Sequence, residues 1–180
     1  MKADYCEKNF FMIVLAALTL ENRLAVLVSL YTGLRISDVL NLKTEQIRKQ
    51  RFSVRELKTG KIRHIRLSNE LLDDLLAISG KIYVFSNRLD YRKPRTRQAV
   101  YKDLKRACDL LRISKTLTIS PHTARKIYAV NLRYDDKMDL KKIQGLLNHS
   151  SEAVTMIYAM ADELTRKSHT ESQLKTAKLS

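Results

Sequence analysis

The chain has 180 residues, 44% of them hydrophobic and only four Gly and two Pro, so it can build a core of its own and is not a mainly disordered chain. Its 34 Lys and Arg exceed 19 Asp and Glu to give a net charge of +15, which suits a polyanionic partner, nucleic acid first. Cys6 and Cys108 form neither a metal-ligand pattern nor a disulfide framework, and the apolar run 10–20 is too short to span a bilayer. We therefore expect a cytoplasmic protein that binds no membrane.

The first part of the chain has the apolar periodicity of helices. Residues 8–30 predict one or two buried helices that end near Thr32-Gly33. A helical pattern then restarts in LRISDVLNLKTEQI, residues 34–47. Gly33 should separate the two, because glycine readily adopts the backbone of a tight turn. This region therefore predicts two helical segments joined by a sharp bend.

From residue 51 the period changes to that of a β-hairpin. In RFSVRELKTGKIRHIRLS the apolar residues Phe52 and Val54, then Ile62 and Ile65, lie on either side of a turn-forming segment, 58–61. The remainder again predicts helices joined by short loops. The expected segments are a helix over 68–78 capped by Ser68, an extended piece at 83–86, a basic loop at 88–98, a helix from Thr96, a helix begun by Ser120-Pro121, and two more helices after residue 138. The fold class is mainly α with a small β-hairpin.

Four groups of residues, dispersed along the chain, together favour chemistry on a phosphodiester. Two arginines can clamp one phosphate, a tyrosine beside it can attack phosphorus, and a lysine or histidine can protonate the leaving oxygen. A protein–DNA ester conserves the bond energy, so we expect no cofactor and no metal. The residues are Arg35 with Asp38, Lys58, His122 with Arg125 on one helix face, and His149 with Tyr158 nine positions later.

Each of these residues also has an ordinary structural explanation. Arg35 could be a surface charge, Lys58 a solvated turn lysine and His122 a helix cap, and Tyr158 could pack its ring in a core. Any one residue alone favours that explanation. Their order and spacing along the chain favour the chemical one.

In this order the four groups resemble the catalytic domain of the tyrosine recombinases, also called the phage integrase family. TGLRISDVLNL resembles the first arginine box of the family, and ELKTGKIRHIRL resembles its lysine-bearing hairpin. SPHTARKIYAVNL resembles its His-x-x-Arg box, and LLNHSSEAVTMIYAM its closing stretch. The resemblance implies the tyrosine recombinase catalytic-domain fold (α+β) over residues 1–162. Residues 163–180 would be a polar tail, a candidate docking element for a neighbouring protomer, and the N-terminal core-binding domain usual in the family is expected to be absent from this chain.

The resemblance also implies a role for each residue. Arg35 and Arg125 would hold the scissile phosphate, while Lys58 would protonate the 5′ oxygen. His122 would act as acid or base near the nucleophile, Tyr158, which would form a 3′-phosphotyrosyl intermediate. The remaining two residues would act on these groups or on the phosphate: His149 by a hydrogen bond to a phosphate oxygen, and Asp38 by orienting its neighbours.

The implied function is site-specific recombination of double-stranded DNA, for integration or excision of a mobile element. The family implies a homotetramer on DNA, with the free protein a monomer, in a cytoplasmic location on nucleoid or viral DNA. Two other functions stay open: a DNA-binding regulator that has lost turnover, and a strand cleaver and resealer like a type IB topoisomerase. Five basic residues are expected to line the DNA groove, or else to form a merely solvated loop: Arg88, Arg92, Lys93, Arg95 and Arg97.

Overall fold

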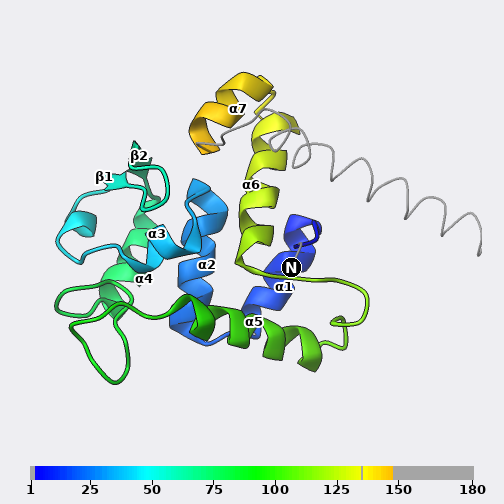
Figure 1. The fold of residues 1–180 in the computed structure, drawn as a ribbon, viewed down its shortest axis with the longest axis horizontal. Coiled ribbons are helices and arrows are strands. Elements are labelled where there is room, and N and C mark those ends of the chain that lie inside the picture. The colour runs from blue at the N-terminus through cyan, green and yellow to red at the C-terminus, as the bar shows by residue number, and fades with distance from the viewer. Residues whose placement is uncertain (1–2, 135, 148–180) are drawn as a thin grey trace, which may run out of the picture.

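A computed structural model of the chain describes residues 3–134 and 136–147, and in these ranges the protein is mainly helical with one two-stranded antiparallel sheet (Figure 1). This confirms the predicted fold class. The elements are, in order, α1 (Lys8–Ala16), α2 (Leu20–Thr32), α3 (Ile36–Leu40), the 3-10 helix η1 (Gln46–Arg48), β1 (Arg51–Arg55), β2 (Ile62–Arg66), α4 (Asn69–Ile78), α5 (Arg97–Leu110), α6 (Pro121–Tyr134) and α7 (Leu140–Leu147).

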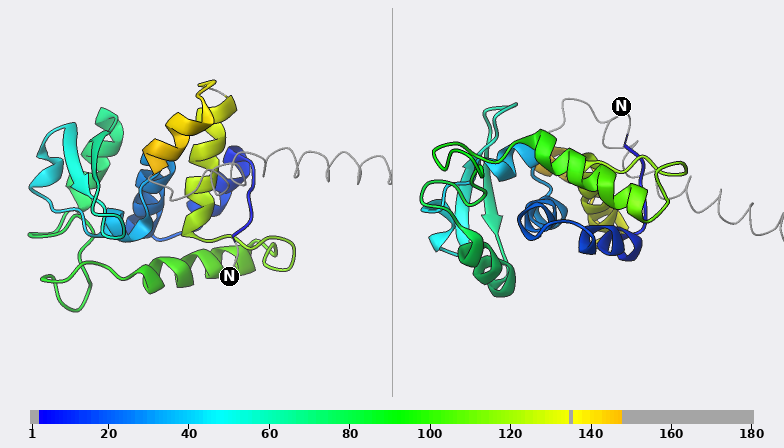
Figure 2. Two further views of the ribbon diagram at one scale, coloured as in Figure 1. Left: turned by 45° about the horizontal axis from the view of Figure 1, so that its top comes forward. Right: turned by 90° about the horizontal axis from the view of Figure 1, so that it is seen from below.

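Helix α2 is the central element of the fold. It contacts α1, α3, α4, α5 and α6, and Figures 1 and 2 show the hairpin and α4 on one side of it and α1 and α6 on the other. Most of its residues are buried, including Leu24, Val28 and Leu30, and each such side chain contributes about 1.5–3 kcal/mol by leaving water. The C-terminal end of α2 is therefore held firmly, and the candidate site is built there.

The predicted break at Gly33 is confirmed. Gly33 caps α2 with φ of 66°, in the left-handed region that glycine tolerates, and its N–H donates to Ser29 O. A Cβ at this position would lie 2.4 Å from the Tyr128 ring of α6. The residue is therefore required twice, once for the turn and once for the close approach of α6.

The helix predicted over residues 34–47 is wrong in its length. Helix α3 ends at Leu40, because the backbone that follows pairs with a distant segment instead of with itself. Val84 N–H donates to Leu42 O, Thr44 N–H donates to Ile82 O, and Lys43 forms an isolated bridge with Tyr83. This pairing prevents residues 42–44 from continuing the helix, and it includes Tyr83 and Val84 of the extended piece predicted at 83–86.

The predicted hairpin is confirmed, but one of its apolar residues, Ile62, faces away from the core. Val54 pairs with Arg63 and Phe52 with Ile65, so these residues share the face that packs on the core. Ile62 is 55% exposed, because it is three residues from Ile65 and side chains alternate along a strand. Arg63, and not Ile62, lies on the inward face, where it pairs with Val54.

The remaining described elements begin where the sequence predicts. Ser68 Oγ accepts from Leu71 N–H at 3.3 Å and Thr96 Oγ1 from Ala99 N–H at 3.2 Å, and Pro121 is the first residue of α6. Residues 8–30 form two helices, α1 and α2. The helix predicted after residue 150 and the tail 163–180 lie outside the described residues. Within the part of the chain that is described, no helix is both long and apolar enough to cross a membrane.

Candidate active site

Arg125 fastens three elements together at the C-terminal end of α2. One terminal nitrogen of its guanidinium, Nη1, donates to Gly33 O, and the other, Nη2, donates to Leu147 O at 2.9 Å. The residue is 3% exposed. Because a guanidinium presents its donors in a planar fork, two carbonyl partners fix its plane. Arg125 therefore joins α6, the turn at Gly33 and the end of α7 in one arrangement.

Arg35 follows the Gly33 turn and immediately precedes α3. Its side chain is 15% exposed, and Nη1 donates to Glu56 Oε2 at 2.6 Å across to the hairpin. Both predicted phosphate-binding arginines are therefore anchored at the same turn, Arg125 through the carbonyl of Gly33 and Arg35 through its place in the chain. Each is oriented by a partner from another element.

Asp38 ties α3 to the turn of the hairpin. Its Oδ1 accepts from Leu57 N–H at 2.9 Å, one residue before Lys58. Burial, and to a smaller degree the charge of Glu56, raises the pKa of the Asp38 carboxyl. Its other oxygen, Oδ2, is buried and has no hydrogen-bond partner among the described residues. This placement suits the orienting role expected of Asp38.

Lys58 lies at the exposed side of the turn that joins β1 to β2. Two backbone hydrogen bonds close the turn, from Glu56 N–H to Lys61 O and from Gly60 N–H to Glu56 O. Gly60 has φ of 67° and open space around it, so here glycine serves the turn alone. The lysine is thus carried on an ordered turn that Asp38 and Glu56 hold against α3.

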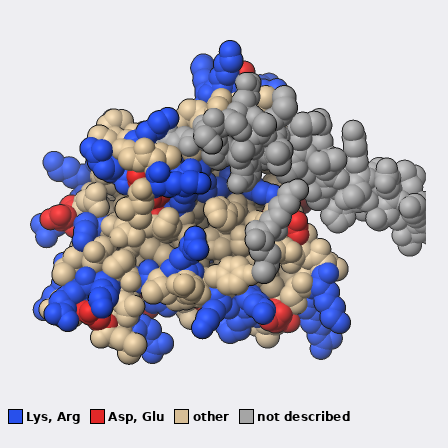
Figure 3. All heavy atoms as spheres, viewed as in Figure 1, with Lys and Arg blue, Asp and Glu red and all other residues tan. Residues whose placement is uncertain are grey.

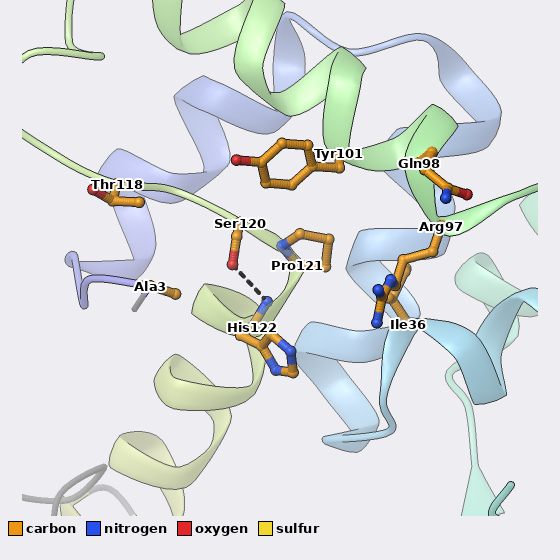
Figure 4. Close-up of a pocket in the computed structure, with 9 residues that line it drawn as sticks. All are labelled: Ala3, Ile36, Arg97, Gln98, Tyr101, Thr118, Ser120, Pro121 and His122. Atoms are coloured by element: carbon orange, nitrogen blue, oxygen red, sulfur yellow. Dashed lines mark hydrogen bonds between the residues drawn. The ribbon is translucent and has the colours of Figure 1, made fainter. Parts of the chain in front are cut away.

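His122 lies at the start of α6, on the wall of a pocket of about 430 Å³. Its N–H donates to Ser120 Oγ at 3.2 Å, and Figure 4 shows Arg97 of α5 reaching the same pocket. His122 comes to the surface whereas Arg125, one turn later, is buried, so the helix face that they share runs from surface to core. Partial burial, followed by the charges of Arg125, Arg97 and Arg35, lowers the pKa of the His122 imidazole. A neutral imidazole at pH 7 can accept a proton.

The other two predicted residues, His149 and Tyr158, lie outside the described residues. The described chain ends at Leu147, whose carbonyl accepts from Arg125. Leu147 stands two positions before His149 in the sequence. The last described residue therefore lies directly at the buried arginine.

The five basic residues predicted to bind DNA occupy different environments. Arg92 and Lys93 are more than 70% exposed and share Asp90, at 3.0 and 3.5 Å, while Arg88 is also exposed. Arg95 turns inward, where its Nε donates to Asn22 Oδ1 of α2 at 2.6 Å. Three of the five are therefore solvated cations: Arg88, Arg92 and Lys93. Arg97 lies at the pocket beside His122, and Arg95 anchors the loop.

Two charged residues of this region escaped the sequence-based prediction. Arg63 Nη2 donates to Thr32 O at 2.7 Å, and Arg63 Nη1 lies 3.6 Å from Glu56 Oε1. Glu56 is fully buried between Arg63 and Arg35. The period of the hairpin already placed Arg63 on the face of Val54 and Ile65, and that signal could have identified it.

Positive charge extends beyond the site. Figure 3 shows Lys and Arg at many places over this face of the molecule, with few Asp and Glu between them. Among the described residues, no group of three or more His, Cys, Asp or Glu is placed to hold a metal ion. The described part of the site holds guanidinium groups with fixed partners, one imidazole and one lysine. Guanidinium groups bind phosphate oxygens, and an imidazole or a lysine can protonate them.

The sequence of the chain matches a known family over most of its length. The sequence pattern of the phage integrase family matches residues 4–164, so the chain belongs to that family. The protein YoeC of Bacillus subtilis (strain 168), named a probable integrase/recombinase, is 30% identical over 141 residues, which are 76% of this chain and 75% of YoeC. The tyrosine recombinase XerA of Pyrococcus furiosus is 31% identical over 150 residues, which are 77% of this chain but 50% of XerA. The chain thus spans about half of this second relative.

Solved structures show the same fold at lower sequence identity. A lambda integrase fragment, residues 75–356, solved as a dimer bound to a COC′ core site, superposes with a TM-score of 0.72 at 22% identity, over 88% of this chain and 60% of the fragment. The XerA recombinase structure superposes with a TM-score of 0.67 at 21% identity, over 92% of this chain and 63% of that one. Both confirm the catalytic-domain fold that the resemblance implied.

Proposed function

We propose that this chain is a site-specific DNA recombinase that cleaves and rejoins strands through a 3′-phosphotyrosyl intermediate on Tyr158, for integration or excision of a mobile element. The observation that carries the proposal is the convergence of three sequence boxes at the Gly33 turn. Arg125 donates to Gly33 O, Arg35 follows two residues later, and Asp38 holds the turn that carries Lys58. Residues as far apart in the sequence as Arg35 and Arg125 therefore lie in one small region of the fold.

The proposed reaction divides into attack and departure. The Tyr158 hydroxyl oxygen forms a bond to phosphorus while the bond from phosphorus to the 5′ oxygen breaks. Arg35 and Arg125 stabilise the charge that develops on the non-bridging oxygens, and His149 adds a hydrogen bond to one of them. Lys58 delivers a proton to the departing 5′ oxygen, and His122 takes the proton of the tyrosine. Rejoining reverses these steps with a 5′ hydroxyl from the partner strand.

The pKa of His122 supports its place in this scheme. Because partial burial and nearby arginines lower that pKa, the imidazole is neutral at pH 7 and able to act as a base. We expect the rate of cleavage to fall on acidification with a midpoint below the ordinary pKa of histidine, about 6.5. His122→Gln, which cannot take a proton, should remove this dependence along with most of the rate.

Double-stranded DNA is the proposed partner, and we propose that four copies of the chain assemble on it as a homotetramer. The net charge of +15 and the exposed cations of the loop at 88–93 support a polyanion, since each neutralised phosphate releases counterions. Structural neighbours were solved with DNA, among them the XerH recombinase bound to its difH substrate.

The experiment that tests the proposal captures the covalent intermediate. The protein is incubated without ATP or added metal with a pool of nicked duplexes of randomised core sequence, so that a cleaved strand loses its short end and cannot be resealed. Protein–DNA adducts that survive denaturation are isolated and their DNA is sequenced. We expect an adduct that carries a shared sequence and that is lost in Tyr158→Phe.

Two other results would favour the alternatives. Binding to the selected DNA without any adduct would favour the regulator that has lost turnover. Adduct formation together with relaxation of a supercoiled plasmid, but no exchange between two plasmids that carry the selected site, would favour the topoisomerase-like function. A band that persists in Tyr158→Phe would overturn the assignment of the nucleophile.

A further inference from the structure

Glu56 is a buried carboxylate that contacts two arginines and a threonine of the candidate site. It is fully buried at the end of β1, between two guanidinium groups. Arg35 Nη1 lies 2.6 Å from its Oε2, and Arg63 Nη1 lies 3.6 Å from its Oε1. A buried carboxylate is costly unless it is paired and hydrogen-bonded, and these two arginines supply the pairing.

One oxygen atom of Glu56 links two parts of the candidate site. Oε2 accepts from Arg35 and also from Thr59 Oγ1, at 2.9 Å. Thr59 directly follows Lys58, and on the other side of Lys58 the Leu57 N–H is held by Asp38. Lys58 therefore lies between two anchored residues, one of which shares its anchor with Arg35.

We propose that Glu56 is a positioning residue for strand cleavage, whose carboxylate sets Arg35 and the turn of Lys58 in one mutual arrangement. The inference rests on the proposed function, because it assigns Glu56 a role toward two groups of that site. Without this carboxylate the Arg35 side chain would sample several rotamers, and the turn would lose a side-chain contact. Catalytic groups act efficiently only within about 0.5 Å of their productive geometry, so even a modest loss of order should slow cleavage.

A purely structural role for Glu56, the neutralisation of Arg63, makes a different prediction. Glu56→Gln alone leaves Arg63 buried without a carboxylate, and that variant could simply fail to fold. The informative set is therefore Arg63→Met and the double variant Glu56→Gln/Arg63→Met. Methionine fills the volume of the arginine stem without a charge, so neither variant keeps a buried cation at position 63.

The rate of adduct formation at saturating DNA distinguishes the two roles. If Glu56 positions Arg35, Arg63→Met should cleave at nearly the wild-type rate, and the double variant about 10- to 100-fold more slowly. DNA affinity should change less than about threefold in both, because most of it comes from other phosphate contacts. Thermal unfolding of both variants verifies that the compared proteins are folded.

A second substrate tests the part of the inference that concerns Lys58. A 5′-bridging sulfur in place of the oxygen leaves as a thiolate and needs no proton, so it bypasses the general acid. The deficit of the double variant relative to Arg63→Met should shrink on this substrate. An unchanged deficit would overturn the effect on the Lys58 turn and leave Glu56 acting on Arg35 alone.

The outcomes separate this inference from the proposed function. Equal rates for the double variant and Arg63→Met would overturn the positioning role while cleavage by the wild type stands. A faster double variant would also overturn it, because Glu56 would then hold Arg35 away from the phosphate. A wild type that binds the DNA and forms no adduct would instead overturn the proposed function.

Discussion

The cations at the Gly33 turn and those of the loop at 88–93 occupy opposite environments. Arg35 and Arg125 are largely buried, and each donates to a buried carboxylate or a carbonyl from another element. Arg92 and Lys93 project into solvent and share one carboxylate, Asp90, within their own loop. The first group holds a fixed geometry, whereas the second supplies charge without one.

This difference indicates what each group can contribute. A buried guanidinium with fixed partners is already oriented for a transition state, so it should affect the rate of cleavage. Exposed ion pairs contribute little to stability and leave the side chains mobile, so the loop should affect affinity and its dependence on salt. Of four predictions, ordered from the largest expected effect to the smallest, the first and the last test that division, and the other two test the stability of the two regions.

Arg125→Lys should have the largest effect. Lysine cannot reproduce a planar fork that donates to both Gly33 O and Leu147 O, so we expect adduct formation to fall on the order of 1,000-fold at saturating DNA. Arg133→Lys, at an exposed position of the same helix, is the matched control and should cleave like the wild type. If Arg125→Lys kept more than a tenth of the rate, the orientation of Arg125 would be irrelevant to cleavage.

Gly33→Ala should be the most destabilising small substitution of the site. Its positive φ and a Cβ that would meet the Tyr128 ring at 2.4 Å together predict a loss of about 2–4 kcal/mol in the free energy of unfolding. Gly145→Ala in α7 has open space and an ordinary helical backbone, so it should raise stability by about 0.5–1 kcal/mol. Urea unfolding of both variants measures the contrast, and a similar effect of the two would contradict it.

Asp103 anchors the base of the basic loop, through Asn22 to Arg95. Burial raises the pKa of its carboxyl, but hydrogen bonds from Asn22, Thr19 and Arg106 outweigh it and lower the pKa to about 2. A carboxyl with a depressed pKa in the folded state stabilises the protein above its unfolded value, 3.8, and this contribution is lost as the pH falls from about 4 to about 2.

Asp103→Asn should therefore lower the free energy of unfolding by about 2 kcal/mol at pH 7. The difference from the wild type should shrink as the pH approaches about 2, which urea unfolding at several pH values can follow. Asp109→Asn, exposed on the same helix, should change stability by less than about 0.5 kcal/mol. A pH-independent difference at Asp103 would show that packing, not charge, is responsible.

The double variant Arg92→Gln/Lys93→Gln should have the smallest effect. We expect a loss of affinity of a few fold and a slope of log affinity against log salt that is less steep by about 2, if both residues contact phosphates. The rate of adduct formation at saturating DNA should not change. Arg92→Lys keeps the charge and should keep the slope, and an unaltered slope in the double variant would place the DNA elsewhere.

Local patterns in the sequence determined much of this protein. Gly33 marked the end of α2, Ser68 and Thr96 marked the starts of helices, and the alternation around 58–61 marked the hairpin, because each of these depends on a few neighbouring residues. The order of the four boxes was enough to identify the family. The roles assigned to Tyr158 and His149 stay predictions, since both lie outside the described residues.

The tertiary structure alone decided the features that depend on distant segments. Helix α3 stops at Leu40 because residues 42–44 pair with 82–84, a contact that no local window contains. Glu56 looks like an ordinary charge of a hairpin turn, and only the packing of that hairpin on the Gly33 turn buries it between Arg63 and Arg35. Arg95 likewise belongs to a basic loop in sequence, but in space it is half-buried and its Nε donates to Asn22 Oδ1 of α2. Spacing along the chain predicts local hydrogen bonds. The fold determines which charged groups are buried, and a buried charge is stable only when it is paired with a group of opposite charge or hydrogen-bonded.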